Sequence, residues 1–89
     1  MRAVITVVGK DAVGIIAEVS GVLKRRGVNI VDITQSVMSD LFAMVMMADI
    51  SACTVPFGAL ADELADLGRR LGLDVRAMHE DIFNSMHRI

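Results

Sequence analysis

The sequence predicts one α+β domain, a four-stranded antiparallel sheet with two helices on one face, in the order strand, helix, strand, strand, helix, strand. Three observations predict this fold. Apolar residues at steps of three and four mark two helices, and four β-branched or alternating runs mark the strands. The third is the length of 89 residues, which suits one domain and is too short for two.

The first half of the chain predicts a strand, a helix and an edge strand. Residues 2–8 form a β-branched run in which both alternating sets of side chains are apolar. This pattern predicts a central strand that is covered on both faces. Residues 15–23 carry apolar side chains at helical spacing, and Lys24-Arg25-Arg26-Gly27 has the cationic residues and glycine of a helix end. Residues 28–38 mix Val, Ile and Thr with polar side chains, as an edge strand with one solvated side does.

The second half predicts a hairpin partner, a helix and a last strand. Ser39 and Asp40 predict a tight turn, with Asp40 the residue suited to a left-handed conformation, into a buried strand over 41–50. Residues 73–77 alternate as a half-exposed strand does. We place the domain at 1–81 and a docking tail at 82–89, whose helical spacing is too short to be stable alone. The clearest helix has apolar residues at Phe57, Leu60, Leu64, Leu67 and Leu71.

The composition argues against several classes of function. A net charge of -2, no Trp or Tyr and three Phe leave neither the basic field nor the stacking rings of nucleic-acid binders, so we expect no direct nucleic-acid binding. No apolar run reaches the ~20 residues that cross a bilayer, and the first residues do not resemble a signal peptide. We expect a soluble, cytoplasmic protein with no membrane contact. Since 54% of the residues are hydrophobic, we expect part of the apolar surplus to lie in a subunit interface.

The residue types needed for catalysis or metal binding do not assemble in the sequence. It offers no Ser-His-Asp or Cys-His arrangement and no phosphate-binding loop, so we expect no enzymatic activity. Cys53 is the single cysteine, which favours a small apolar residue over a redox centre. His79 and His87, near Glu80 and Asp81, match no standard zinc spacing. We therefore expect no metal and no cofactor.

The loop after the first strand distinguishes among functions that share the βαββαβ order. A soft-metal carrier would place two cysteines in this loop, and residues 9–14 contain none. An RNA-recognition domain displays aromatic rings on its central strands, where this chain has only Phe42. An acylphosphatase would need an arginine in the loop, which offers only Lys10. What remains is a loop with glycine at both ends and Asp11 between them.

This loop resembles that of the ACT domain, a ferredoxin-like fold whose first loop has the form Gly-x-Asp-Arg-Pro-Gly before an apolar helix. Gly27-Val28-Asn29-Ile30 resembles a second motif of the family, and the likeness covers residues 2–81. More narrowly, Phe42-Ala43-Met44 and residues 80–89 resemble stand-alone bacterial and archaeal ACT proteins related to the glycine-cleavage-system regulator. Ala12-Val13 departs from the Arg-Pro of many members.

The resemblance implies a non-enzymatic regulatory module that binds a small amino acid or related carboxylate at a dimer interface. It further implies action in trans on an enzyme or regulator, a protein partner that the sequence does not identify. We expect a homodimer, because an edge strand, an apolar surplus and an amphipathic tail all need a partner. The alternative is a ligand-free dimerisation or protein-interaction module.

The predicted ligand site joins the loop to the start of the second strand. N–H groups at a helix start favour a carboxylate, Gly14 leaves room for it, and Asn29 or Asp32 can accept from an ammonium group. The alternative is structural, with glycines that permit a tight turn and Asp11 as a helix cap. The candidate ligand-binding residues are Gly9, Lys10, Asp11, Ala12, Val13, Gly14, Ile15, Asn29, Ile30 and Asp32.

Overall fold

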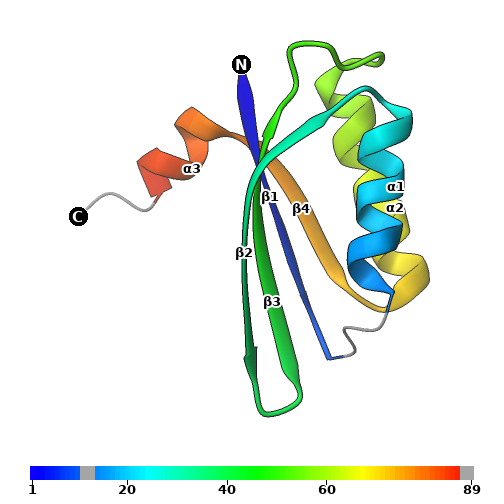
Figure 1. Ribbon diagram of the computed structural model, residues 1–89, viewed down its shortest axis with the longest axis vertical. Coiled ribbons are helices and arrows are strands. Elements are labelled where there is room, and N and C mark those ends of the chain that lie inside the picture. Colours follow the sequence, from blue (N-terminus) through cyan, green and yellow to red (C-terminus); the bar gives the residue numbers. More distant parts are fainter. Residues whose placement is uncertain (11–13, 87–89) are drawn as a thin grey trace.

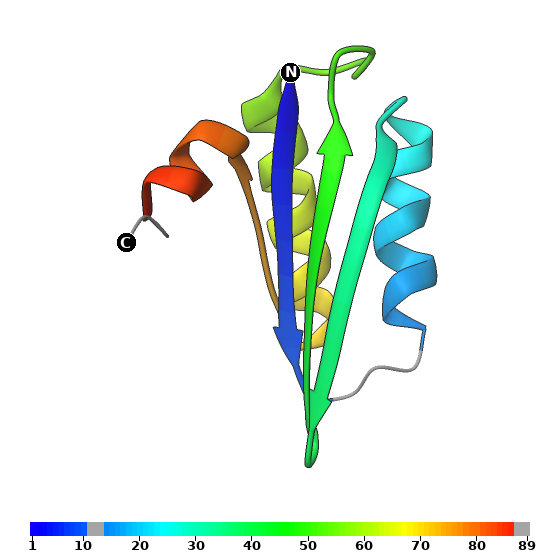
Figure 2. The ribbon, with the colours of Figure 1, turned by 60° about the vertical axis from the view of Figure 1, so that its left-hand side comes forward.

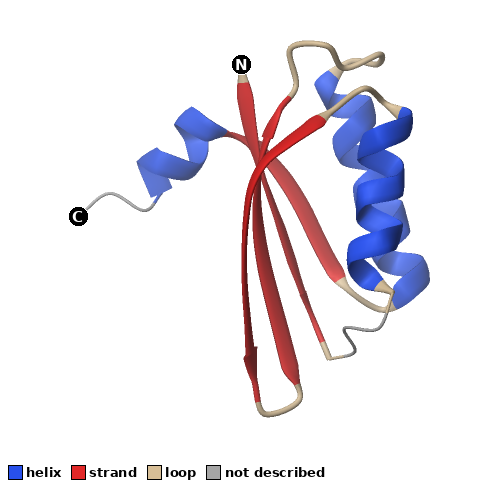
Figure 3. Cartoon of the chain, viewed as in Figure 1, coloured by secondary structure: helices blue, strands red, loops and turns tan. Residues whose placement is uncertain are grey.

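The computed structural model describes residues 1–10 and 14–86 and confirms the ferredoxin-like βαββαβ order. The sheet is antiparallel, in the order β2-β3-β1-β4. Two helices cover one face of the sheet, and a third, short helix lies on the other side (Figures 1 and 3). The elements are β1 (Arg2–Gly9), α1 (Ile15–Arg25), β2 (Asn29–Met38), β3 (Leu41–Asp49), α2 (Phe57–Leu71), β4 (Asp74–His79) and α3 (Glu80–Met86).

The hydrophobic core lies between the sheet and the helices α1 and α2. Alternate side chains of each central strand point toward the helices, so Ile5 of β1 lies beside Met46 of β3, and Val7 beside Met44. Each large apolar side chain buried there stabilises the fold by roughly 1.5–3 kcal/mol. The helices contribute the apolar stripes that their spacing predicts, namely Ile15, Val19, Val22 and Leu23 from α1 and Leu60, Leu64 and Leu67 from α2.

The opposite side of the sheet, which we call the open face, is only partly covered. The prediction that β1 is covered on both faces is wrong for a single chain, because Val4 is fully buried but Val8 is 40% exposed. The prediction of a buried β3 is wrong in the same way, since Val45 is 39% exposed. The strand registers assign to this face the apolar residues Val4, Val8, Met38, Leu41, Ala43, Val45, Met47 and Met78, together with Thr6.

The third helix covers only one end of the open face. Its seven residues extend about 10 Å, whereas β1 extends about 26 Å. It packs against β1 and β4 near the start of the chain and leaves the hairpin end of the sheet bare, as Figure 2 shows. The tail predicted at 82–89 is therefore, as far as residue 86, part of a helix that begins at Glu80. This helix contacts its own domain, while Ile82 and Met86 stay exposed.

The β2–β3 hairpin turns through Ser39 and Asp40, as the sequence predicts, but the left-handed residue is Ser39, with φ of 57°. We expected Asp40 in that role. A positive φ at the first of the two central residues is the geometry of a type II′ turn, whose twist matches that of the paired strands. The geometry of the hairpin therefore decides which residue takes the positive φ.

Helix α2 approaches β4 most closely at Gly68. An added Cβ at this position would lie 2.8 Å from the backbone oxygen of Leu73 and 2.9 Å from Val75 Cγ2. The N–H of Leu73 donates to the oxygen of Gly68 at 2.8 Å, so this backbone contact also ends the helix. Gly58, in the first turn of the same helix, has no heavy atom within 4 Å of an added Cβ among the described residues.

We predict opposite effects for alanine at these two glycines. Gly68→Ala must displace backbone, so it should lower the free energy of unfolding by about 1–3 kcal/mol. Gly58→Ala adds only helix propensity and should raise the free energy of unfolding by up to about 1 kcal/mol. Urea denaturation of both variants checks this, and equal effects at the two positions would contradict the close helix-to-strand packing.

Candidate functional site

The loop residues of the predicted site lie where β1 ends and α1 begins. Asp11, Ala12 and Val13 fall outside the described residues. Gly14 is exposed, has φ of 78°, and has no heavy atom within 4 Å of an added Cβ among the described residues. The side chain of Ile15 is buried in the core, so only its backbone can face a ligand. Space is therefore open beside the start of α1.

Gly9 at the end of β1 has a packing role. A Cβ added there would overlap Cδ2 of Leu73, which follows α2. The packing against Leu73, rather than a tight turn, explains why a glycine lies here. Lys10, the next residue, is exposed at the end of the strand. Of the loop residues that the structure describes, Lys10 and Gly14 have open space beside them.

The strand residues of the predicted site lie on both sides of a β-bulge. The register of β2 against β3 shifts between Ile30 and Asp32, which leaves Val31 as the extra residue. Ile30 therefore points toward the helices, beside Ala48. Asp32 lies on the open-face side, and its Oδ1 accepts a hydrogen bond of 2.9 Å from the N–H of Ile33. The bulge separates two residues that a regular strand would place on one face.

The loop and the strand start do not meet within one chain. They lie at opposite ends of α1, as Figure 1 shows, and the eleven residues of this helix separate them by about 16 Å. An amino acid spans less than this distance. Within a single chain the predicted site is therefore divided into two parts, which we call half-sites, one at Gly14 and one at Asn29 and Asp32.

A pocket of about 510 Å³ lies at the strand half-site, between the last turn of α1 and the start of β2. It contains the predicted residues Asn29 and Ile30 together with Ser20 and Lys24, which we did not predict. The sequence favoured Lys24 only as a helix-end charge. The pocket thus combines a hydroxyl and an amide, which can donate or accept hydrogen bonds, with the ammonium of Lys24. The pocket is lined by Ser20, Leu23, Lys24, Gly27, Val28, Asn29 and Ile30.

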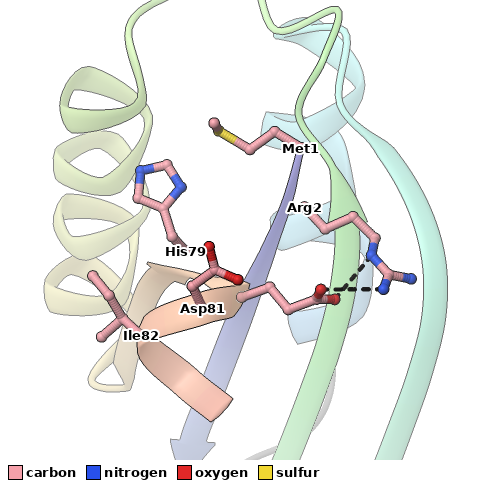
Figure 4. Close-up of a pocket in the computed structure, with 6 residues that line it drawn as sticks. Met1, Arg2, His79, Asp81 and Ile82 are labelled. Carbon is pink, nitrogen blue, oxygen red and sulfur yellow. Dashed lines mark hydrogen bonds and ion pairs between the residues drawn. The ribbon is translucent and has the colours of Figure 1, made fainter. Parts of the chain in front are cut away.

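A second pocket, of about 610 Å³, lies where β1 begins and β4 passes into α3 (Figure 4). Arg2 and Glu80 form an ion pair across it, with Nε to Oε2 at 2.8 Å and Nη2 to Oε1 at 3.1 Å. This pair fastens the start of α3 to β1. The residues that line the pocket are Met1, Arg2, His79, Glu80, Asp81 and Ile82.

His79 contacts an aromatic ring in the structure. Its ring stacks on that of Phe57, the first residue of α2, with the centroids 4.2 Å apart. Within residues 1–10 and 14–86, no group of three or more His, Cys, Asp or Glu side chains is arranged to hold a metal ion. His87, the other histidine, lies outside the described residues. The stacked ring is therefore part of the packing between α2 and β4.

An ion pair fixes the end of α1 that forms the smaller pocket. Arg26 Nε lies 2.7 Å from Glu63 Oε1, and its Nη2 donates to Oε2 at 3.3 Å. The bond from Arg26 lowers the pKa of Glu63, and the same bond raises the pKa of Arg26. The backbone N–H of Thr54 also donates a hydrogen bond of 2.8 Å to the backbone oxygen of Arg26. The junction of α1 and β2 is thus tied to α2 and to the loop before it.

We predict that the ion pair between Arg26 and Glu63 stabilises the fold less at acid pH. Since folding lowers the pKa of Glu63, its stabilising effect is present above the ordinary glutamate value of about 4.3 and disappears as the pH falls through the lower, folded value. Glu63→Gln should slightly lower the free energy of unfolding at pH 7, and the difference from the unsubstituted protein should be smaller at pH 3. Urea denaturation at both pH values measures it. A pH-independent difference, or an equal effect of Asp62→Asn on the same helix, would contradict the prediction.

The topology, with two helices on one face of a β2-β3-β1-β4 sheet, defines the protein as a ferredoxin-like α+β domain. A protein-family model described as the ACT domain matches residues 2–78. The chain therefore belongs to the ACT-domain family, whose members are typically small-ligand-binding regulatory modules. The predicted resemblance to stand-alone ACT-domain proteins is confirmed. In the described residues, no helix has the length and apolarity to cross a membrane.

The relatives are small proteins of similar length. A UPF0237 protein of Methanopyrus kandleri is 50% identical over 88 residues, which are 99% of this chain and 98% of the relative. The solved ACT domain protein from Streptococcus pneumoniae has a TM-score of 0.81 at 38% identity and covers 93% of each chain. A proposed glycine cleavage system transcriptional repressor has a TM-score of 0.69 at 25% identity, over 86% of this chain and 44% of the repressor.

Proposed function

We propose that this chain is a non-enzymatic, cytoplasmic regulatory module that binds a small amino acid or related carboxylate at the interface of a homodimer. It acts in trans on an enzyme or regulator. The observation that carries the proposal is the separation of the two half-sites by the length of α1, next to an exposed edge strand. Membership of the ACT-domain family supports the ligand-binding role.

The exposed edge strand is β2, which lies at one border of the sheet. Residues 31–38 are all exposed, and they include the apolar residues Val31, Ile33 and Val37. A long edge strand with exposed apolar residues is a ready template for pairing with another strand. Two copies related by a two-fold axis pair the same strand with itself, and the two strands then run antiparallel. Such a pair forms one sheet of eight strands.

The antiparallel pairing brings the two half-sites together. The end of one β2 lies beside the start of the other, and α1 of each copy runs back along its own β2, so that α1 begins on the side toward the hairpin, as Figures 1 and 2 show. The Gly14 end of one subunit therefore approaches Asn29 and Asp32 of the second subunit. The homodimer joins the half-sites that a single chain keeps about 16 Å apart.

The chemistry of the joined site suits an amino acid. The first N–H groups of α1 carry partial positive charge and favour the carboxylate, and the open space at Gly14 admits it. Asn29, which lines the pocket beside α1, provides an oxygen for the ammonium group, and Asp32, on the open-face side of the same edge strand, provides a negative charge nearby. Asp32 already accepts one bond from Ile33, but a carboxylate has about four acceptor positions and keeps the capacity for a ligand.

Calorimetric titration of the twenty amino acids tests the site. At least one amino acid should bind, Gly14→Leu should abolish that binding, and Asp32→Ala should weaken it more than it weakens a carboxylate without an amine. Gly72→Leu is the matched control, because Gly72 has nearly the same positive φ and the same open surroundings at the end of α2. It imposes the same backbone strain away from the site and should leave the affinity unchanged.

Equal losses of binding in Gly14→Leu and Gly72→Leu would show general destabilisation and contradict the placement of the site. Binding that persists in Gly14→Leu would place the site elsewhere. If no amino acid binds and none raises the melting temperature, as a ligand specific to the folded state must, the ligand-free interaction module is the better description.

The edge pairing has its own test. The double variant Ile33→Lys with Val37→Lys places like charges on both copies of the exposed strand, which disfavours strand pairing. We predict that this variant sediments with half the mass of the unsubstituted protein and loses amino-acid binding. An unchanged mass in sedimentation equilibrium would exclude the β2 edge as the dimer interface.

A further inference from the structure

We propose that the open face of the sheet is a second interface, on which α3 of another copy of this chain packs. This interface is independent of the β2 edge. Ile33 and Val37 point to the helix side of the sheet, whereas the residues that alternate with them in β2 point to the open face. The partner is a second copy rather than an unrelated protein.

The open face has the composition of a buried surface. Cross-strand rows place Val4 beside Met47 and Met78, and Val8 beside Ala43. Central strands that are apolar on both parities are the pattern of a sheet covered on both sides. The helices α1 and α2 cover one side, so the sequence pattern requires a second cover on the other.

The open face also has the layout of an interface, with an apolar centre and a polar border. The centre is formed by β1 and β3. The border is mostly polar: on β2 it holds Thr34 and Ser36 beside Met38, and on β4 it holds Asp74 and Arg76, which pair at 3.0 Å, beside Met78. Protein interfaces have this arrangement of an apolar core inside a solvated, polar rim.

The third helix shows what kind of element covers this face. It packs over the end that holds Val4, held by the ion pair between Arg2 and Glu80, and Val4 is fully buried. The other end, with Val8, Leu41 and Val45, is bare. A seven-residue helix is too short to be stable without packing, yet Ile82 is 52% and Met86 is 65% exposed. The helix and the bare end of the sheet therefore both present uncovered apolar surface.

A second copy satisfies both surfaces at once. A two-fold axis parallel to the sheet and perpendicular to the strands places the α3 of each copy on the bare end of the other. The same surface then serves both subunits, as a symmetric interface requires. The face measures about 26 Å by 19 Å, or about 500 Å² in projection. The uneven surface of the side chains and the exposed side of α3 add further area. The area buried on each subunit then approaches the roughly 800 Å² per partner of a stable interface.

The two interfaces together define the size of the assembly. Edge pairing has its two-fold axis perpendicular to the sheet and face pairing has its axis parallel to the sheet, so the assembly closes at four copies when these two axes intersect. The unsubstituted protein should therefore sediment with four times the chain mass of 9.6 kDa. Loss of either interface should leave two copies, and loss of both should leave the single chain.

The decisive variants remove apolar surface from the open face without touching the helix-side core. Val45→Asp places a charge at the centre of the face, and the double variant Ile82→Ser with Met86→Ser alters only α3. Each should halve the mass measured by sedimentation equilibrium at micromolar concentration. The matched control is Leu71→Ser, because Leu71 is 43% exposed at the end of α2, outside both interfaces, and should leave four copies. The serine variant guards against misfolding, because its two side chains are exposed in the single chain.

Combination with Ile33→Lys and Val37→Lys separates the two interfaces. Val45→Asp on that background should give the 9.6 kDa chain. If neither face variant changes the mass of the unsubstituted protein, the second interface is overturned, while the edge pairing is judged by the lysine variant alone. If the face variants halve the mass and the lysine variant does not, the open face is supported and the edge pairing fails. An unsubstituted protein that sediments as a 9.6 kDa monomer overturns both.

Discussion

Two helices can cover only one face of a four-stranded sheet, and this limit governs the rest of the molecule. The covered face holds the large apolar residues of β1 and β3, such as Ile5, Met44 and Met46, and its burial stabilises the fold. The same two strands carry apolar residues on the other side. The short α3 covers part of that side, and the ion pair of Arg2 with Glu80 holds it there. The exposure of Val8 and Val45 follows directly.

The fold could be predicted because its signals are local. The leucines of α2 recur at the period of the helix whose face they bury, so Leu60, Leu64 and Leu67 mark both the element and its contacts. The two-sided apolar pattern of β1 correctly marked a central strand. The pattern could not predict whether the open face is covered by the same chain or by another one. It indicates that these residues are buried from water, but not which element buries them. In the turn, the twist of the hairpin selected Ser39 over Asp40 for positive φ.

The residues of the candidate site could be proposed from their chemistry, but their arrangement in space could not be predicted. Gly14, Asn29 and Asp32 were chosen by residue type, and residue type says nothing of the helix length that separates them. The bulge at Val31 moves Asp32 to the open-face side, and bulges leave little trace in a single sequence. Lys24 has the charge expected of any helix end, so its place in a pocket appears only when β2 packs beside it.

The placement of Gly14 and Asn29 at opposite ends of α1 has a thermodynamic consequence. A ligand held by groups from two subunits binds the associated form better than the separated chain, so ligand binding and association are linked. The linkage is reciprocal: ligand strengthens association, and a higher protein concentration raises the apparent affinity for ligand. In the proposed homodimer, the cellular level of an amino acid would thereby set the fraction of assembled protein, and a partner that recognises only the assembled surface would respond to that level.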